Sequence, residues 1–381
     1  MQGVEPMERR NGSGIVKRKY LFGALIALFI CATMAPAQVT LGRFRHGRNE
    51  LEQVQSCIGG QIVDFTCNHG RDNRFFSPAL CTKRDMYVYL PPCYDPRKQY
   101  PLMIYMHGFS QDERSFLELV PMFDQAIREG KCPPTIVASP DGSLFGRPSF
   151  LYAGSFYVNS KAGRFEDYVM QDVWTLLHEK FSIRPEPEAH ALVGGSMGGF
   201  SAYNLGIKYR AAVRNVAAVF PPLNLRYLDC HGRYFADFDP NCLSWRQEVR
   251  PKAPVARYFG GLVKIRERRF VNALFDTKRQ NPIAEIAREN PIEMLDTYNL
   301  RPGELEMFIG YGGRDEFNID AQVESFIYFA KCRGHCISVM YIKSAHHTFE
   351  GGKQFFPGMI QWLGEKLAPY GPCIPAESTR R

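Results

Sequence analysis

The chain has 381 residues, of which 45% are hydrophobic and 23% are charged, and these are ordinary proportions for a globular protein. The composition excludes a disordered tail, a collagen-like fibre and a polytopic membrane protein, while the length allows one large domain or two smaller ones. Because five of the 47 basic and two of the 39 acidic residues lie within residues 1–37, the net charge of +8 falls to +5 for the remainder. Such a mild charge gives no electrostatic reason to expect nucleic acid as a partner.

The N-terminus predicts an export signal. The basic cluster Lys17-Arg18-Lys19 precedes an apolar run from Tyr20 to Met34, and Ala35-Pro36-Ala37 has the small-x-small spacing of a cleavage site. The run is short for a membrane span, which needs about 20 residues. Cleavage is therefore favoured and would leave residues 38–381 as a secreted or periplasmic chain. The alternative is an uncleaved N-terminal anchor, and only then is a membrane expected as a partner.

Cysteine usage agrees with export. Cys31 lies within the predicted signal, and the ten cysteines that follow are an even number, which in an oxidising compartment suggests disulfides without fixing their pairing. No C-x-x-C pair occurs, and Cys230-His231 has no partner at zinc-finger spacing. We therefore expect no metal site.

The body of the chain alternates predicted strands with predicted helices. In its first part the strands are predicted at 85–90, 102–106, 135–139, 189–193 and 215–220, and the helices at 115–128, 165–181 and 200–209. The pattern resumes with strands at 305–309 and 336–342 and helices at 320–333 and 354–367. This alternation predicts an α/β fold with a mostly parallel central sheet and helices on both faces.

The alternation lapses between Leu223 and Thr297. This segment predicts an insertion within a single catalytic domain, placed before the last two strands. It is either a lid or a surface elaboration that covers apolar sheet, and the sequence leaves both open. The basic cluster Lys264–Arg269 is interpreted as a solvated helix face rather than a phosphate or membrane patch.

The segment Gly194 to Gly199 contains the pattern G-x-S-x-G around Ser196. A predicted strand comes directly before it and a predicted helix follows. Such a strand-to-helix turn needs glycines beside the serine, because neighbouring backbones approach closely there. The alternative, a glycine-rich turn with an incidental serine, is less favoured in this context. Ser196 is the candidate nucleophile.

A nucleophilic serine needs a base and an orienting acid, because a free hydroxyl is a poor nucleophile at neutral pH. Asp315 directly follows the predicted strand 305–309 and is the candidate acid, with Glu316 and Asp320 as alternatives. Asp320 is the better candidate for capping the next helix. The strand 336–342 is followed by two adjacent histidines, His346 and His347, so the candidate base is one of this pair.

Acyl transfer also needs hydrogen-bond donors aimed at the developing oxyanion. The backbone N–H of Met197, just after the candidate nucleophile, is one candidate. The second is expected in the loop after an early strand, and Phe109 in His107-Gly108-Phe109 has that position.

These motifs resemble the esterase D branch of the α/β-hydrolases, which includes S-formylglutathione hydrolases, feruloyl and acetylxylan esterases and mycolyltransferases. The segments that carry the resemblance are 84–92, 107–109, 194–199, 312–318 and 347–349, and it covers about residues 60–367. The resemblance implies that the base is followed by x-aromatic and by a helix ending in Trp-Leu. His347-Thr348-Phe349 and Trp362-Leu363 fit that register, although Ala345 stands where relatives often have glycine.

The sequence therefore predicts an exported serine carboxylic-ester hydrolase that acts through Ser196, His347 and Asp315, with Met197 and Phe109 at the oxyanion and no cofactor or metal. The expected substrate is a small-molecule or carbohydrate-linked ester. Two alternatives stay open: acyl transfer to a sugar or lipid alcohol by the same triad, and an inactive carbohydrate-binding protein on this fold.

Overall fold

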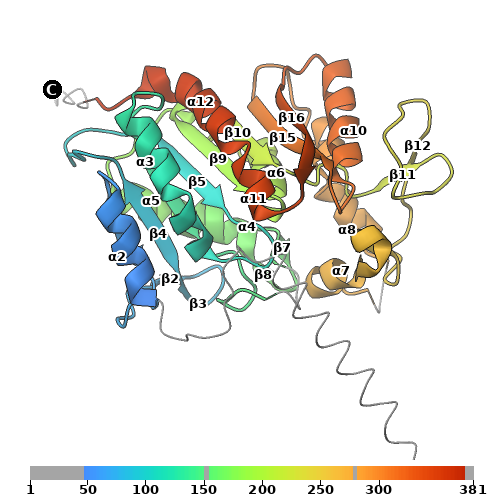
Figure 1. Ribbon diagram of the computed structural model, residues 1–381, viewed down its shortest axis with the longest axis horizontal. Helices are drawn as coiled ribbons and strands as arrows, with labels where there is room; N and C mark the ends of the chain where they lie inside the picture. The colour runs from blue at the N-terminus through green and yellow to red at the C-terminus, as the bar shows by residue number, and fades with distance from the viewer. Residues whose placement is uncertain (1–46, 150–153, 278–280, 374–381) are drawn as a thin grey trace, which may run out of the picture. The chain divides into compact units, whose positions relative to one another are not determined.

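The structure is a computed structural model that describes residues 47–149, 154–277 and 281–373, so the predicted export signal lies outside it. The described part is an α/β fold built on an eight-stranded sheet (Figure 1). Among the described helices, none is both long and apolar enough to span a membrane.

The central sheet is mostly parallel, as predicted. Its strands, in spatial order, are β1 (Gln61–Phe65), β4 (Met86–Leu90), β6 (Ile136–Pro140), β5 (Leu102–Met106), β9 (His190–Gly195), β10 (Asn215–Val219), β15 (Glu306–Arg314) and β16 (Ser338–His346). Only the pairings β1–β4 and β4–β6 are antiparallel. Strands β4, β5, β6 and β10 are buried at every position, which explains why their sequences are mainly apolar.

Helices cover both faces of the sheet, which confirms the predicted layering. Figure 1 shows α3 (Val120–Arg128) and α12 (Phe356–Leu367), which contact each other, in front of the sheet, and α6 (Met197–Lys208) behind it. Helix α2 (Gly47–Cys57) packs on α3, whereas α9 (Pro291–Thr297) packs on α6 and on α10 (Ile319–Cys332). The predicted helix 165–181 is a continuous run of α4 (Phe165–Asp167), the π-helical η2 (Tyr168–Val173) and α5 (Trp174–Lys180).

Several predicted boundaries are wrong in ways that bear on the site. The predicted helix 115–128 divides into a 3₁₀ helix, η1 (Glu113–Glu118), and α3, which has Pro121 in its first turn. Strand β15 runs to Arg314 and β16 to His346, so both are longer than predicted. Helix α10 has Asn318 as its N-cap residue, and Asp320 lies inside its first turn rather than capping it.

The insertion consists of short ribbons and helices. It contains β11 (Tyr227–Asp229), β12 (Leu243–Trp245), β13 (Pro254–Tyr258), η4 (Phe259–Gly261), β14 (Val263–Arg266), α7 (Arg268–Leu274) and α8 (Ile283–Arg288). The basic cluster predicted as one helix face is therefore divided between β14 and α7. The remaining small elements of the fold are β2 (Phe75–Ser77), β3 (Thr82–Arg84), β7 (Asn159–Ser160), β8 (Gly163–Arg164), η3 (Pro187–Ala189), α11 (Phe349–Lys353) and η5 (Ala368–Tyr370).

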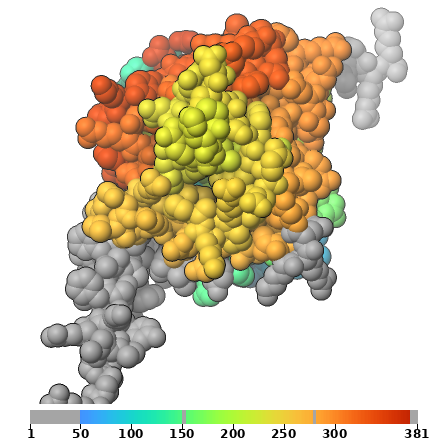
Figure 2. All heavy atoms as spheres, turned by 90° about the vertical axis from the view of Figure 1, so that its right-hand side faces the viewer, coloured from blue at the N-terminus to red at the C-terminus, as the bar shows by residue number. Residues whose placement is uncertain are grey.

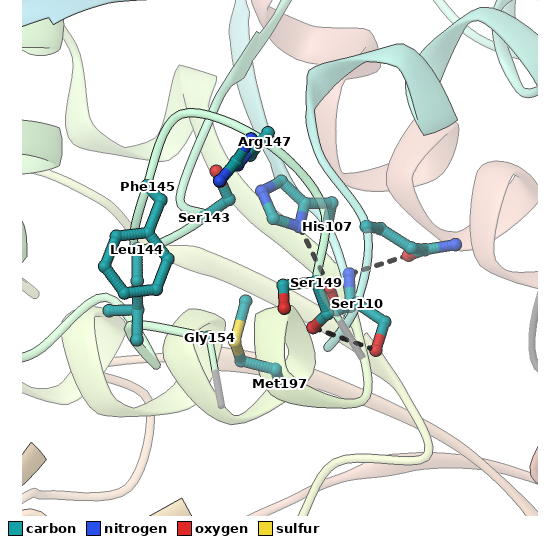
Figure 3. A pocket seen from close by; sticks show the side chains of 11 residues that line it. His107, Ser110, Ser143, Leu144, Phe145, Arg147, Ser149, Gly154 and Met197 are labelled. Atoms are coloured by element: carbon teal, nitrogen blue, oxygen red, sulfur yellow. Dashed lines mark hydrogen bonds between the residues drawn. The ribbon is translucent and has the colours of Figure 1, made fainter. Parts of the chain in front are cut away.

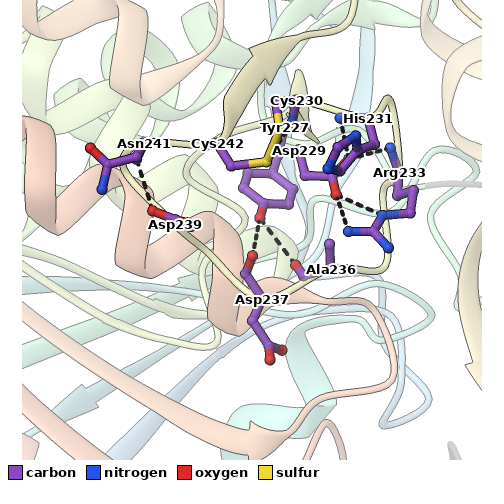
Figure 4. Close-up of a disulfide and its surroundings, with 10 residues drawn as sticks. All are labelled: Tyr227, Asp229, Cys230, His231, Arg233, Ala236, Asp237, Asp239, Asn241 and Cys242. Atoms are coloured by element: carbon purple, nitrogen blue, oxygen red, sulfur yellow. Dashed lines mark hydrogen bonds and ion pairs between the residues drawn. A yellow bond between two sulfur atoms is a disulfide. The ribbon is translucent and has the colours of Figure 1, made fainter.

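One disulfide, Cys230–Cys242, joins the two strands of the β11–β12 ribbon (Figure 4). The ligand atoms of Cys230, His231 and Cys242 lie within 4.8 Å of one another, but both sulfurs are committed to the disulfide and neither is a thiolate ligand. The other described cysteines are free thiols, namely Cys57, Cys67, Cys81, Cys93, Cys132, Cys332, Cys336 and Cys373. The prediction of disulfides thus holds for one pair among the described residues.

Candidate active site

Ser196 sits on a sharp turn between β9 and α6. Its backbone has φ 52° and ψ −114°, a region that non-glycine residues rarely occupy. The turn is held from both sides, because the Ser196 N–H donates to the Val219 carbonyl at 2.8 Å and the Phe200 N–H donates to the Ser196 carbonyl at 2.9 Å. This turn places the Ser196 hydroxyl within hydrogen-bond distance of a histidine side chain.

The glycines around Ser196 are required by close backbone contacts. A Cβ atom at Gly194 would overlap the backbone carbonyl of Gly198, and one at Gly198 would overlap the carbonyl oxygen of Met106. Strand β5 therefore lies against the turn, in register with β9 where Met106 pairs with Gly194. This contact places the loop after β5 directly beside the serine.

His347 and Asp315 complete a hydrogen-bonded chain with the serine. His347 Nε2 lies 2.8 Å from Ser196 Oγ, and His347 Nδ1 lies 2.7 Å from Asp315 Oδ2. Because an ionised carboxylate only accepts, Nδ1 carries the proton and Nε2 accepts from the serine hydroxyl. Residues from three separate loops, after β9, β15 and β16, are thus brought together in the order Ser, Asp, His.

Asp315 is fully buried and held by backbone donors. Its Oδ1 accepts from the Phe317 N–H at 2.8 Å, while its other oxygen accepts from His347. The His347 ring packs between Phe220, at 5.0 Å between centroids, and Phe317, at 4.7 Å. Both partners of the pair are therefore fixed in orientation.

The charge environment favours the imidazolium form of His347. Burial alone would lower the pKa of His347, but the charge and hydrogen bond of Asp315, together with the charge of Glu316, raise it above 6.5. A base of this kind accepts a proton readily and holds it as an imidazolium stabilised by the carboxylate.

The alternative residues occupy other positions. His346 Nδ1 lies 2.8 Å from Glu316 Oε1, and the His346 side chain is 49% exposed. The second oxygen of Glu316 accepts the backbone N–H of His347 at 2.9 Å. Burial, with the nearby charge of Asp315, raises the pKa of Asp320 to about 6, so this carboxyl is poorly suited to stabilise an imidazolium. Sequence reasoning treated Glu316 only as an alternative acid and missed its place behind the histidine pair.

The loop of the predicted oxyanion residue Phe109 is anchored by buried hydrogen bonds. His107 Nδ1 donates to the Gly108 carbonyl at 2.9 Å, and His107 Nε2 accepts from the Gly142 N–H at 2.8 Å. The side chain of Gln111 accepts the Gly108 N–H at 2.8 Å. These bonds fix the turn that presents Phe109, while Met197 lies at the N-terminus of α6, where backbone N–H groups have no partner within the helix.

A buried ion pair lies next to the loop that contains Phe109. Arg84 Nη2 lies 2.8 Å from an Asp141 carboxylate oxygen and also donates to the Asp141 and Ser143 carbonyls. Burial would raise the pKa of Asp141, but the charge of Arg84 holds it below its usual value. Arg84 and Asp141 were not singled out from the sequence, because their partners are far away along the chain.

Comparison with known proteins decides the class of this site. Residues 77–362 match the model of the esterase family, which is described as "Putative esterase". The match spans most of the chain. The chain belongs to the esterase family. It is therefore a carboxylic ester hydrolase of the serine type, and the resemblance stated from its motifs is confirmed.

Solved structures similar to this esterase share its fold. A ferulic acid esterase has 15% identity and a TM-score of 0.56, covering 81% of this chain and 99% of its own. An S-formylglutathione hydrolase from Agrobacterium tumefaciens has 16% identity and a TM-score of 0.57, over 81% and 96% of the two chains. A ferulic acid esterase from Anaeromyces mucronatus has 18% identity and a TM-score of 0.52, over 81% and 91%. At identities this low, the structural similarity establishes the α/β-hydrolase fold alone.

A pocket of the esterase opens beside the serine-bearing turn (Figure 3). Its wall joins the loop after β5, the segment after β6 and the first residue of α6. It is lined by His107, Gly108, Ser110, Gln111, Ser143, Leu144, Phe145, Arg147, Ser149, Gly154 and Met197. The pocket therefore offers apolar surface from Met197 and Leu144 together with hydroxyl and amide groups.

Phe270, from the insertion of the esterase, packs among aromatic side chains of the site. Phe270 of α7 lies 5.2 Å from the Phe109 ring and 6.4 Å from the Phe317 ring, measured between centroids. It also contacts Phe156 at 6.0 Å. Since Phe317 packs on His347, a continuous row of rings connects the insertion to the histidine.

Proposed function

We propose that this esterase is an exported serine hydrolase in which Ser196, His347 and Asp315 form the catalytic triad. The hydrogen-bonded chain from Ser196 Oγ through the imidazole to Asp315, with separations of 2.8 and 2.7 Å, carries the proposal. These residue types in this order are the arrangement that activates a serine hydroxyl in unrelated hydrolases.

The chemistry follows from these contacts. Ser196 Oγ attacks the ester carbonyl carbon while His347 Nε2 takes its proton, and Asp315 stabilises the resulting imidazolium. The oxyanion accepts hydrogen bonds from the Met197 and Phe109 amides. When the intermediate collapses, Nε2 gives the proton to the leaving alcohol, and water then repeats the cycle on the acyl-enzyme.

The surroundings favour an ester with an apolar or aromatic part. The row of rings from Phe109 to Phe317 packs beside the triad, and the pocket next to Met197 is lined in part by apolar side chains. The structure of the Anaeromyces enzyme is of a complex with ferulic acid, an aromatic acid, on a similar fold. We propose a small-molecule ester as the substrate.

Export through the predicted signal is part of the proposal. The Cys230–Cys242 disulfide supports an oxidising compartment, where such bonds persist. N-terminal sequencing of protein from its natural source is expected to start near Gln38. A chain that starts at Met1 and stays with the membrane would instead favour the anchor.

The proposed nucleophile is tested by Ser196→Ala. The variant is expected to lose about six orders of magnitude in kcat, as is seen when the nucleophile of a comparable triad is removed. The measurement is hydrolysis of a panel of p-nitrophenyl, feruloyl and acetylated-sugar esters, together with labelling by a fluorophosphonate probe. A variant that retains more than about a hundredth of the wild-type rate would show that Ser196 is not the nucleophile.

The same panel separates hydrolysis from acyl transfer. With a sugar or long-chain alcohol added, a hydrolase keeps releasing free acid at an unchanged rate, whereas a transferase forms the new ester in its place. Wild-type protein that is folded but neither reacts with the probe nor cleaves any ester would favour an inactive binding protein.

A further inference from the structure

The β13–β14 ribbon of the insertion ends in an exposed apolar tip. Phe259 is 53% exposed and Leu262 is 88% exposed, and the two are joined by a hydrogen bond from the Leu262 N–H to the Phe259 carbonyl. Phe259 has φ 51°, a left-handed conformation that is costly for a bulky residue. Phe259 thus combines a strained backbone conformation with an aromatic ring that is exposed to solvent.

The exposed charged side chains of the ribbon and of the start of α7 give this part of the insertion a positive charge. Between residues 252 and 269 the only carboxylate is Glu267, which is buried and paired with Arg246. The exposed charged side chains that share this segment are basic, and they include Lys252, Arg257, Lys264, Arg266 and Arg268. An apolar tip on a cationic segment is typical of segments that enter the boundary between lipid headgroups and acyl chains.

The end of the ribbon next to the tip contacts the loop that carries Asp315. The Arg257 N–H donates to the Glu316 carbonyl at 2.9 Å, and the Tyr258 ring lies 6.1 Å from the Phe317 ring. Glu316 and Phe317 directly follow Asp315, so whatever holds the tip also fixes the position of the catalytic loops. Figure 2 looks onto this side of the molecule, where residues of the insertion, in yellow to gold, gather.

We propose that this hairpin tip docks on an anionic lipid surface and holds the esterase there, so that its ester substrate is taken from that surface. The substrate part of this proposal rests on the proposed function, whereas the docking does not. Lipid is favoured over a folded acidic partner because the tip offers two protruding side chains and diffuse charge rather than a shaped groove. The basic cluster by itself indicated only a solvated face, and the structure adds the apolar tip.

Binding is tested with the full chain carrying Ser196→Ala, so that no lipid is hydrolysed during the measurement. Co-sedimentation is compared between phosphatidylcholine vesicles with and without about 30% phosphatidylglycerol. We expect preference for the anionic vesicles, and a loss of at least about tenfold in partitioning when Phe259→Ser and Leu262→Ser are combined. Lys264→Gln and Arg268→Gln are expected to cost about fivefold each at low salt.

Matched controls separate the tip from general charge and from the N-terminal segment, which all variants share. Arg97→Gln with Lys98→Gln removes two exposed cations elsewhere and is expected to bind as the parent does. Leu262→Trp is expected to be quenched by anionic vesicles with brominated acyl chains, whereas Phe76→Trp, at a side chain that is 60% exposed in β2, is not. Hydrolysis of p-nitrophenyl acetate by tip variants that retain Ser196 is expected to be unchanged.

Three outcomes overturn the proposal: equal partitioning of the tip variant and its parent, equal binding to neutral and anionic vesicles, or an unquenched Leu262→Trp. Binding to a soluble polyanion such as heparin without binding to vesicles would assign the basic surface to another class of partner. If Ser196→Ala keeps its esterase activity, the proposed nucleophile fails, while the vesicle data still decide the docking.

Discussion

The catalytic frame and the insertion of this esterase are built in contrasting ways. In the frame, Ser196, Asp315 and His347 follow the ends of strands β9, β15 and β16, and each is fixed by short hydrogen bonds to buried partners. The insertion contains two-stranded ribbons outside the central sheet, carries a disulfide and exposes apolar side chains at the β13–β14 tip. We propose that the frame positions the atoms that react and that the insertion influences which substrates reach them.

In the described part of the chain, the two regions meet through aromatic rings and through hydrogen bonds to the residues that follow Asp315, such as the one from the Arg257 N–H to the Glu316 carbonyl. Phe270 contacts both Phe109 and Phe317, and Tyr258 also contacts Phe317. Changes in the frame should therefore affect the rate for every substrate, while changes in the insertion should alter preference among substrates. The following predictions test this division, starting with the largest effect.

His347→Ala should reduce kcat nearly as far as the loss of the nucleophile, about six orders of magnitude, because no other described side chain contacts Ser196 Oγ as a base. His346→Ala is the matched control and should cost about tenfold or less, since positioning errors cost at most about a hundredfold. The measurement is steady-state hydrolysis of one activated ester by both variants. An inactive His346→Ala with an active His347→Ala would reverse the assignment of the base.

Asp315→Asn should lower kcat by about four orders of magnitude, because the amide no longer holds His347 in the tautomer that accepts from serine. The buried volume and the Phe317 N–H bond are kept, so thermal unfolding should change little. Asp320→Asn serves as the control and should stay within about tenfold of wild type. Comparable losses of kcat in the two variants would contradict the assignment of Asp315 as the acid of the triad.

Phe270→Ala should change substrate preference rather than the chemical step. Losing the ring contacts with Phe109 and Phe317 is expected to lower kcat/KM for an aromatic acyl ester by about tenfold relative to an acetyl ester. Phe259→Ala, in the same insertion but away from the rings, is the control. An equal fall for both esters would place Phe270 within the catalytic frame and break the division proposed above.

Glu316→Gln should shift the pH dependence of kcat/KM and have little effect on its maximum. The acidic limb of kcat/KM reports protonation of His347, whose pKa lies above 6.5 in part because of the Glu316 charge. Glutamine keeps an acceptor for the His347 N–H but removes that charge, so the limb should move to lower pH. Glu365→Gln, which alters an exposed carboxylate paired with Gln361, should leave the limb in place. A limb that stays put or rises in Glu316→Gln contradicts the electrostatic role.

The sequence by itself determined the fold class and the candidate triad, because both are local patterns. A parallel strand that is buried on both faces has a continuous apolar sequence. Leu102–Met106 is such a strand, and its bounds were predicted correctly. The turn at Ser196 needs glycines at fixed offsets, and chain order in this fold places the acid and the base after later strands. The esterase family followed from the same motifs.

Only the tertiary structure decided which residues support the site and where the insertion acts. Arg84 pairs with Asp141 and Glu316 bonds to His346 across many residues of chain, and no spacing rule reports such contacts. The break before α3 and the division of the basic cluster between β14 and α7 also depended on packing. Hydrophobic periodicity indicates which face of a segment is buried. Contacts between residues far apart in the chain depend on how the helices and strands pack together.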